Sequence, residues 1–212
     1  MARASLGVVA VVDADGGNAG MNRAEQGKSE TVFIGMGGNL GDPATQIQQA
    51  ARRLHQTPGV VLAALSGLYA NPPMGPQDQP DYVNAVACVH TRLSPVALLT
   101  LLKELERKAG RMITRRWGER VLDLDILSFG QLRMQTDLLT VPHPGIEARR
   151  FVVEPWLEIA PDTRLPDGSY LADIANQLTD HPLELLERPD MHAITAPDVA
   201  GSVKMSSAGG MV

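Results

Sequence analysis

The sequence has few of the residues that mark several large classes of protein. Its 212 residues include a single cysteine, Cys88, which excludes an internal disulfide and favours a reducing cytoplasm. Aromatic residues make up only 4% of the chain and the formal net charge is −5, so a nucleic-acid partner is not expected. The five histidines show no paired zinc-ligand spacing, and zinc is not expected either.

Long hydrophobic runs and a phosphate-binding Walker loop are also missing. No apolar run approaches the ~20 residues of a membrane-spanning helix, so no membrane partner is expected. Without the Walker pattern, a P-loop kinase is excluded. The glycine-rich run 35–41 has Leu40 where the dinucleotide fingerprint needs glycine or alanine, and no acid occurs between Asp42 and Asp78. A Rossmann site is therefore excluded, while a tight turn near a ligand stays open.

Hydrophobic periodicity predicts an α+β fold. Strands are expected at 31–36, 60–69, 82–91 and 121–127, with helices starting at Pro43 and Pro95. The order strand, helix, strand, strand, helix, strand is that of the split βαβ, or ferredoxin-like, fold. It implies an antiparallel sheet with helices packed on one face and the other face free to bind. Later helical segments predict a three-layer α-β-α arrangement with added C-terminal helices.

Composition suggests one folded domain between two appendages. The domain is expected at residues 31–179. Residues 1–30 are expected to be a disordered extension, because the apolar run Leu6–Val12 is short for a signal peptide; Met21 is an alternative initiator. Residues 180–212 turn polar and contain glycine and serine, so they are expected to be a disordered tail.

Two acids share one face of the fourth predicted strand. Leu122, Leu124 and Ile126 alternate with Asp123 and Asp125, so the leucines and isoleucine face a core and the acids face away. The roots of these carboxylates are then roughly 6.5–7 Å apart, which suits hard cations separated by about 3.5–4 Å. On its own, the pattern favours a solvated acidic face over a binding site.

Cations and aromatic residues accompany the acid pair. Magnesium uses one or two protein carboxylates and completes its shell with water and phosphates. Guanidinium groups bind phosphate oxygens, and phosphoryl transfer needs mainly positioning and charge neutralisation. The residues that fit these roles are Arg111, Arg115, Arg116, Arg120, Arg149 and His143, with aromatic rings at 82, 117 and 151.

Four motifs together resemble the 6-hydroxymethyl-7,8-dihydropterin pyrophosphokinase (HPPK) family of folate biosynthesis. They are GPQDQPDYVN at 75–84, RWGERVLDLDIL at 116–127, LTVPHP at 139–144 and EIAP at 158–161. The resemblance runs from about Thr31 to about Leu178 and implies transfer of pyrophosphate from ATP to the pterin alcohol, with two Mg²⁺ ions. We expect a cytoplasmic monomer that acts on small-molecule substrates. The alternative is a non-catalytic nucleotide- or pterin-binding module. The intact acid pair with its arginines argues against this alternative, because a protein that only binds needs no two-metal site.

The resemblance also implies roles for individual residues. The catalytic set is Arg111, Arg120, Asp123 and Asp125, with the two aspartates holding the metal. The residues implied for ATP are Glu106, Arg116, Trp117, Arg120, Ile126, Thr140, His143 and Arg149. The residues implied for the pterin are Asn71, Pro72, Met74, Tyr82, Asn84, Trp117, Asp123 and Phe151. From the residues alone, Tyr82 and Phe151 could be core aromatics, but their pairing with Asn84 on one strand face favours ligand stacking. Glu106 could be ordinary solvated surface at the end of its helix.

Overall fold

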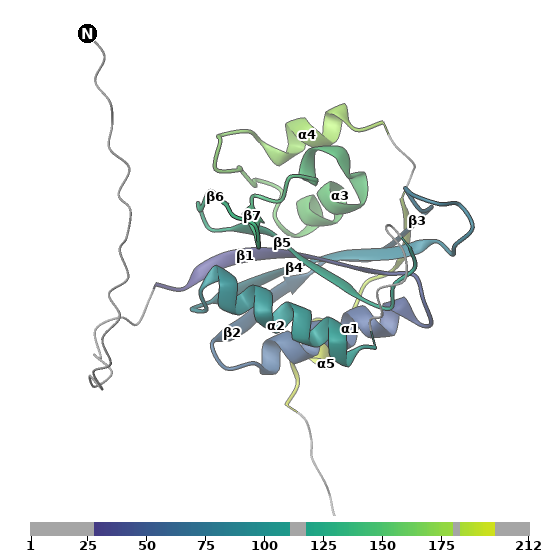
Figure 1. The fold of residues 1–212 in the computed structure, drawn as a ribbon, viewed down its shortest axis with the longest axis horizontal. Helices are drawn as coiled ribbons and strands as arrows, with labels where there is room; N and C mark the ends of the chain where they lie inside the picture. Colours follow the sequence, from purple (N-terminus) through teal and green to yellow (C-terminus); the bar gives the residue numbers. More distant parts are fainter. Residues whose placement is uncertain (1–27, 111–117, 180–182, 198–212) are drawn as a thin grey trace, which may run out of the picture.

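An antiparallel sheet lies between two layers of helices in the computed structural model (Figure 1). The structure describes residues 28–110, 118–179 and 183–197. The strand order is β5-β1-β4-β3-β8, with β2 pairing with β4, and this confirms the predicted antiparallel, ferredoxin-like arrangement. The strands are β1 (Glu30–Gly38), β2 (Val60–Leu65), β3 (Leu68–Asn71), β4 (Tyr82–Thr91), β5 (Asp123–Phe129) and β8 (Glu184–Glu187), with β6 (Met134–Gln135) and β7 (Thr140–Val141) as a separate ribbon.

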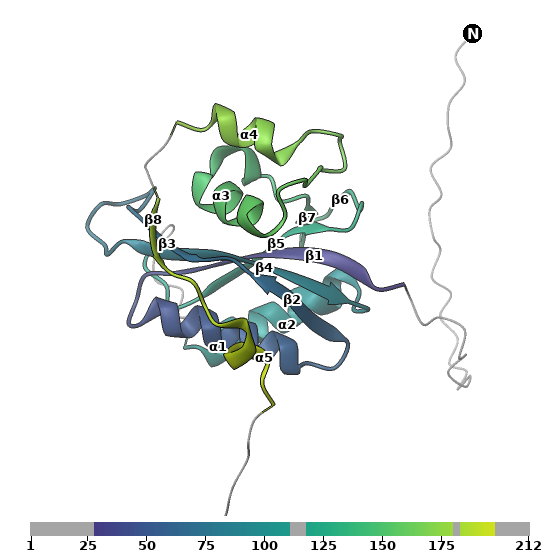
Figure 2. The ribbon, with the colours of Figure 1, turned by 180° about the vertical axis from the view of Figure 1, so that it is seen from behind.

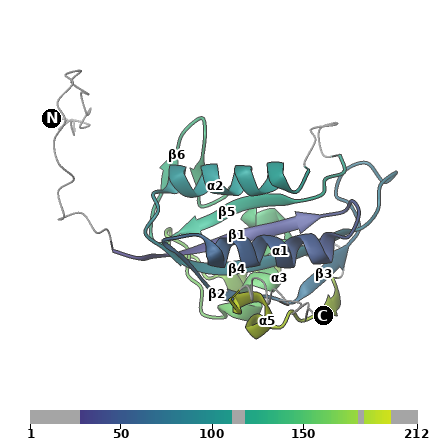
Figure 3. The same cartoon turned by 90° about the horizontal axis from the view of Figure 1, so that it is seen from below.

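Helices cover both faces of the sheet (Figures 1 and 3). One layer contains α1 (Pro43–Gln56), α2 (Pro95–Lys108) and α5 (Met191–Thr195), and the other contains η1 (Ile146–Ala148), α3 (Arg150–Ile159) and α4 (Leu171–Gln177). The three-layer prediction is confirmed. The expectation that the second face is free is wrong in part, because α3 packs on it. Trp156 is fully buried there with its ring centroid 4.7 Å from that of Phe33.

The first two helices form as their sequences predict. Asp42 accepts a hydrogen bond from the Thr45 backbone N–H at 3.1 Å, and Ser94 accepts one from the Ala97 N–H at 3.2 Å. Each cap is followed by a proline in the first turn, where its fixed φ is already helical. The apolar faces of α1 and α2 pack on the sheet because their aliphatic side chains leave water there.

The predicted single strand 60–69 is wrong, because it breaks into β2 and β3. At the break, Ser66 pairs with Val86 in an irregular way. The Ser66 backbone N–H donates to Val86 O, but the Val86 N–H donates to the Ser66 hydroxyl instead of to a backbone carbonyl. Gly67 then donates its N–H to Glu158 Oε2 at 3.0 Å instead of to a strand neighbour. Leucine and valine periodicity cannot reveal such a change of hydrogen-bond partner.

The C-terminal segment is ordered where a disordered tail was predicted. β8 pairs with β3 along the sheet edge, and the chain continues to α5 against α1 (Figure 2). Ile194 on α5 is only 3% exposed, and Asp190 caps the helix by accepting from the His192 N–H. The prediction is therefore wrong for residues 184–195, where a few apolar side chains in a polar stretch suffice for docking. Residues 1–27, 180–182 and 198–212 lie outside the described residues. In the parts of the chain that the structure describes, no helix is long and apolar enough to cross a membrane.

Candidate active site

A cavity of about 280 Å³ opens beside α3, where β1 ends and β4 and β5 begin. Ten of the predicted site residues line it, which brings together segments that are far apart in the sequence. They are Asn71, Met74, Tyr82, Asn84, Arg120, Asp123, Asp125, His143, Arg149 and Phe151.

Two glycines of the central strand form the floor of this cavity. Gly37 pairs with Asp123 of β5 on one side and with Asn84 of β4 on the other; Gly35 likewise pairs with Asp125. Strand neighbours are about 4.8 Å apart, so the acids and the amide face each other across roughly 10 Å of backbone without side chains. A Cβ on Gly37 would come within 2.6 Å of Asn84 Oδ1. Glycine at 37 therefore creates the space between the two sides.

The β5 side of the cavity carries the two acids. Leu124 and Ile126 are buried under the helices α1 and α2, which turns Asp123 and Asp125 toward the cavity, as predicted. Their side chains remain 22% and 39% exposed. The Asp-Leu-Asp pattern is thus part of a cavity rather than an open acidic surface.

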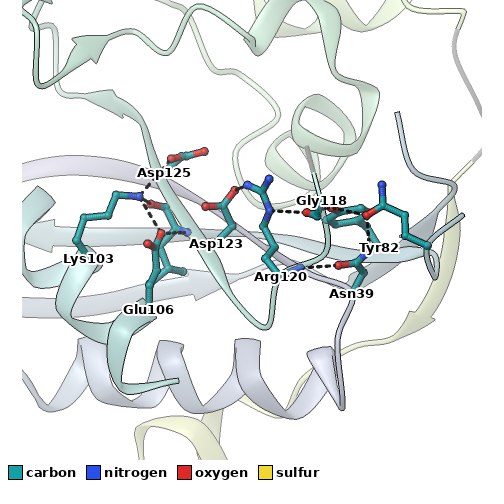
Figure 4. Close-up of polar contacts among 10 residues, drawn as sticks. Asn39, Tyr82, Lys103, Glu106, Gly118, Arg120, Asp123 and Asp125 are labelled. Carbon is teal, nitrogen blue, oxygen red and sulfur yellow. Dashed lines mark hydrogen bonds and ion pairs between the residues drawn. The ribbon is translucent and has the colours of Figure 1, made fainter. Parts of the chain in front are cut away.

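Arg120 lies against the first acid (Figure 4). Its Nη1 donates to Asp123 Oδ2 at 2.5 Å, and its Nε is 3.4 Å from Gly118 O. Burial by itself would lower the pKa of the guanidinium, but Asp123 outweighs this and keeps the pKa of Arg120 above its ordinary value. A permanent cation is therefore held beside a carboxylate at the cavity wall.

His143 and Arg149 complete the charged side. The Gly145 N–H donates to His143 Nδ1 at 2.9 Å, so the neutral ring carries its proton on Nε2. Burial lowers the pKa of His143, partly opposed by Asp125, and Arg149 lowers it further. A neutral imidazole N–H and a guanidinium are both donors suited to phosphate oxygens.

The β4 and β3 side is built from amides and rings. The Asn84 Nδ2 donates to Asn71 Oδ1 at 2.6 Å, and the Asn71 Nδ2 donates to Pro72 O at 2.7 Å. Tyr82 and, from α3, Phe151 also line the cavity. Phe151 packs in addition against the buried cluster around Trp156, so for this ring the core interpretation holds in part. Burial raises the pKa of the Tyr82 hydroxyl, which stays a hydrogen-bond donor.

Glu106 lies behind the acid pair, not in the cavity. It is 2% exposed and accepts from the Leu124 N–H at 2.7 Å and from Lys103 Nζ at 2.8 Å (Figure 4). The reading of Glu106 as solvated surface is therefore wrong. Because Leu124 stands between the two aspartates, this buried carboxylate fixes the strand that presents them.

The remaining predicted residues fall elsewhere. Ile126 is 1% exposed in the core on the other face of β5, and neither Thr140 of β7 nor Pro72 lines the cavity. Arg111, Arg115, Arg116 and Trp117 lie outside the described residues, so their implied roles remain predictions.

Sequence reasoning missed three polar residues next to the cavity. Lys103 donates to Leu124 O at 3.1 Å and its Nζ is 3.8 Å from Asp125 Oδ1; its position three residues before Glu106 on α2 was the available signal. Gln79 lines the cavity, and Asn39 contacts Gln79 from the end of β1. Gln79 belongs to the motif 75–84 and Asn39 to the glycine-rich run 35–41, but neither pattern indicates that the two side chains form a hydrogen bond.

The donor set fits magnesium better than zinc. The two aspartates supply hard oxygen ligands that face a cavity with room for water and phosphate, the arrangement that magnesium uses. Among the described residues, no cluster of three or more histidines, cysteines or acids gathers around a point that could hold a metal. Carboxylates that can hold divalent cations, with guanidinium groups beside them, are typical of enzymes that transfer phosphate-containing groups.

Comparison with known proteins identifies the family. The family model described as 7,8-dihydro-6-hydroxymethylpterin-pyrophosphokinase (HPPK) matches residues 33–161. The 2-amino-4-hydroxy-6-hydroxymethyldihydropteridine pyrophosphokinase of Haemophilus influenzae is 44% identical over 151 residues, which are 71% of this chain and 94% of that protein. The enzyme of the same name from Pseudomonas aeruginosa is 43% identical over 159 residues, or 75% and 96% of the two chains. The chain belongs to the HPPK family.

A solved structure supports the fold independently of close sequence similarity. The crystal structure of Plasmodium falciparum HPPK-DHPS with pteroate matches 73% of this chain with a TM-score of 0.58 and 13% sequence identity. This chain spans only 43% of that larger protein, so the match concerns one part of it. At this level of identity the likeness shows the fold alone.

Proposed function

We propose that this protein transfers pyrophosphate from ATP to 6-hydroxymethyl-7,8-dihydropterin and releases AMP, a reaction of folate biosynthesis. The observation that carries the proposal is the division of the cavity. Asp123, Asp125 and the nearby cations form one side, Asn84 and Tyr82 of β4 form the other, and Phe151 of α3 also lines the cavity. Family membership supports ATP and the pterin alcohol as the two substrates.

The two sides have separate tasks in this reaction. Arg120, His143 and Arg149 would bind the phosphates and neutralise charge that develops during transfer. Tyr82 and Phe151 would hold the planar pterin between their rings, and the Asn84 amide would pair with its polar edge. The hydroxymethyl oxygen would then form a bond to the β-phosphorus and lose its proton to water. The bond from that phosphorus to the oxygen bridging it to the α-phosphate breaks, and AMP leaves with the electron pair on that oxygen.

Asp123 and Asp125 are the residues that would hold magnesium. Bound there, the ions would neutralise and orient the ATP phosphates. We propose two ions, which the presence of two separate carboxylates on one strand face supports. Electron paramagnetic resonance of bound Mn²⁺, with an unreactive ATP analogue present, would count them. One ion at saturation would contradict the proposal.

Product analysis tests the function directly. With ATP, Mg²⁺ and the pterin alcohol, the protein should form AMP in a one-to-one ratio to the pterin diphosphate. Formation of ADP would indicate a simple kinase. Binding of both substrates without AMP would indicate the non-catalytic binding module.

Two further properties are part of the proposal. A cytoplasmic location is supported by the single cysteine, because a chain without an internal disulfide fits a reducing compartment. A monomer is part of the proposal because a single chain supplies the acids, the cations and the rings that line the cavity. Light scattering on the eluate of a size-exclusion column would test the oligomeric state.

A further inference from the structure

A closed ring of polar contacts joins three separate segments beside the cavity (Figure 4). Asn39 follows β1, Gln79 and Tyr82 lie at the start of β4, and Gly118 with Arg120 precedes β5. The Asn39 Nδ2 donates to Gln79 Oε1 at 3.2 Å, and the Tyr82 hydroxyl lies 3.3 Å from that same oxygen and 3.0 Å from Gly118 O. The Arg120 backbone N–H donates to Asn39 Oδ1 at 2.9 Å, which closes the ring.

Asn39 is buried within this ring, with only 4% of its surface exposed. Its side-chain nitrogen also donates to Pro80 O at 3.0 Å, so both ends of its amide are engaged. A buried amide with its donors and acceptor satisfied has a well-defined orientation, and loss of one partner leaves the other group unpaired. The orientation of the Asn39 side chain is therefore fixed beside the cavity.

Backbone hydrogen bonds from residues 39 and 40 also bind the Arg120 peptide. The N–H groups of Asn39 and Leu40 both donate to Arg120 O, at 2.9 and 3.2 Å. The segments approach so closely that a Cβ on Gly38 would come within 2.4 Å of Val121 O. The glycine-rich run thus serves close packing against the segment that carries Arg120.

We propose that Asn39 is a positioning residue that fixes Tyr82, on the pterin side, relative to Arg120, on the charged side. It acts through the Gln79–Pro80 segment in one direction and through the Arg120 peptide in the other. This inference rests on the proposed function. It adds a residue that does not line the cavity and that would link the two halves of the reaction.

The variant Asn39→Asp tests the link to the Gln79–Pro80 segment separately from the link to the Arg120 peptide. Aspartate keeps the shape and the acceptor for the Arg120 N–H, but it lacks the donors to Gln79 and Pro80 and brings a negative charge to the Pro80 carbonyl. We expect KM for the pterin alcohol to rise about tenfold, the scale of one lost buried hydrogen bond, with KM for ATP unchanged. Asn39→Leu also removes the acceptor, and kcat should then fall about 100-fold as Arg120 moves.

Asn176→Asp provides the matched control, because it makes the same chemical change at an exposed position of α4. A purely structural role for Asn39 would reduce the active fraction, which lowers apparent kcat and leaves both KM values unchanged. That result for Asn39→Asp, or a pterin KM equal to that of wild type, would overturn the inference.

Calorimetry keeps this test separate from the test of function. Pterin binding in the presence of an unreactive ATP analogue requires no turnover. A pterin Kd about tenfold weaker in Asn39→Asp would support the inference. An unchanged Kd would refute it. Absence of AMP formation by the wild-type protein would instead refute the proposed function.

Discussion

The two sides of the cavity differ in the kind of chemistry that holds them in place. On the β5 side, charged groups dominate, and Asp123 and Arg120 neutralise each other at 2.5 Å. On the β4 side, uncharged amides dominate, and Asn84 and Asn71 are joined at 2.6 Å. Charge–charge attraction acts over a distance and tolerates small shifts, whereas a neutral hydrogen bond depends on close geometry. The charged side should therefore control rate, and the amide side should control selection of the planar substrate.

The largest effect is expected on the charged side, from Asp125→Asn. Removing this charge should lower kcat about 1,000-fold, the scale of a group that stabilises developing charge, with little change in KM for the pterin. Steady-state AMP formation measures both constants. Asp162→Asn, at an exposed loop position, is the matched control. Near wild-type kcat in Asp125→Asn would remove Asp125 from the catalytic set.

A methyl group on the cavity floor should affect the amide side next. Gly37→Ala places a Cβ 2.6 Å from Asn84 Oδ1 and forces that amide to move, so the pterin KM should rise about 100-fold. Gly35→Ala is the matched comparison, because its Cβ would meet the Leu127 side chain no closer than 3.2 Å, and a leucine side chain can shift. A larger pterin KM in Gly35→Ala than in Gly37→Ala would contradict the division between the two sides.

A change far from both sides should alter stability alone. Ile194→Ala on α5 removes a buried side chain and should lower the free energy of unfolding by about 2 kcal/mol. Neither KM should change. Urea titration gives the stability, and Val61→Ala, at a position 53% exposed on β2, is the control. Altered KM values in Ile194→Ala would show that the C-terminal segment influences the cavity.

The smallest effect concerns pH. Burial lowers the pKa of His143 below its ordinary value of 6.5, so the unfolded chain takes up this proton before the folded protein does as pH falls. This residue should therefore contribute a loss of stability that begins near pH 6.5 and levels off below the folded pKa. His143→Gln should weaken that loss in urea titrations at pH 8 and pH 5.5. The same pH dependence in His143→Gln as in wild type would contradict this expectation. The control is His192→Gln, which changes an exposed histidine of α5.

Much of the fold could be predicted because short-range patterns determine it. Pro43 and Pro95 each follow a capping residue, and the alternation at Leu124 and Ile126 places the acids on one face. The break at Ser66 and the docking of Ile194 depend on partners that are distant in sequence, Val86 and α1, so no local pattern revealed them.

The cavity residues divide in the same way. Asp123, Asp125, Tyr82 and Asn84 could be predicted from strand period and motif together, and the structure brings all four to one cavity. The role of Asn39 could not, because its contacts with Gln79 and Arg120 span 40 and 81 residues. Glu106 was placed with ATP by resemblance, while its burial and its bond to the Leu124 N–H became visible only once α2 was packed against β5.

β8 has a consequence for how the folded protein behaves in concentrated solution. An exposed strand edge presents unpaired N–H and C=O groups to other molecules and promotes association. β8 covers that edge of β3 and is itself short, with Glu184 and Glu187 at its two ends. These charges repel a second copy that approaches edge to edge. A protein shortened to end before residue 183 should therefore aggregate at concentrations at which the full chain stays dispersed.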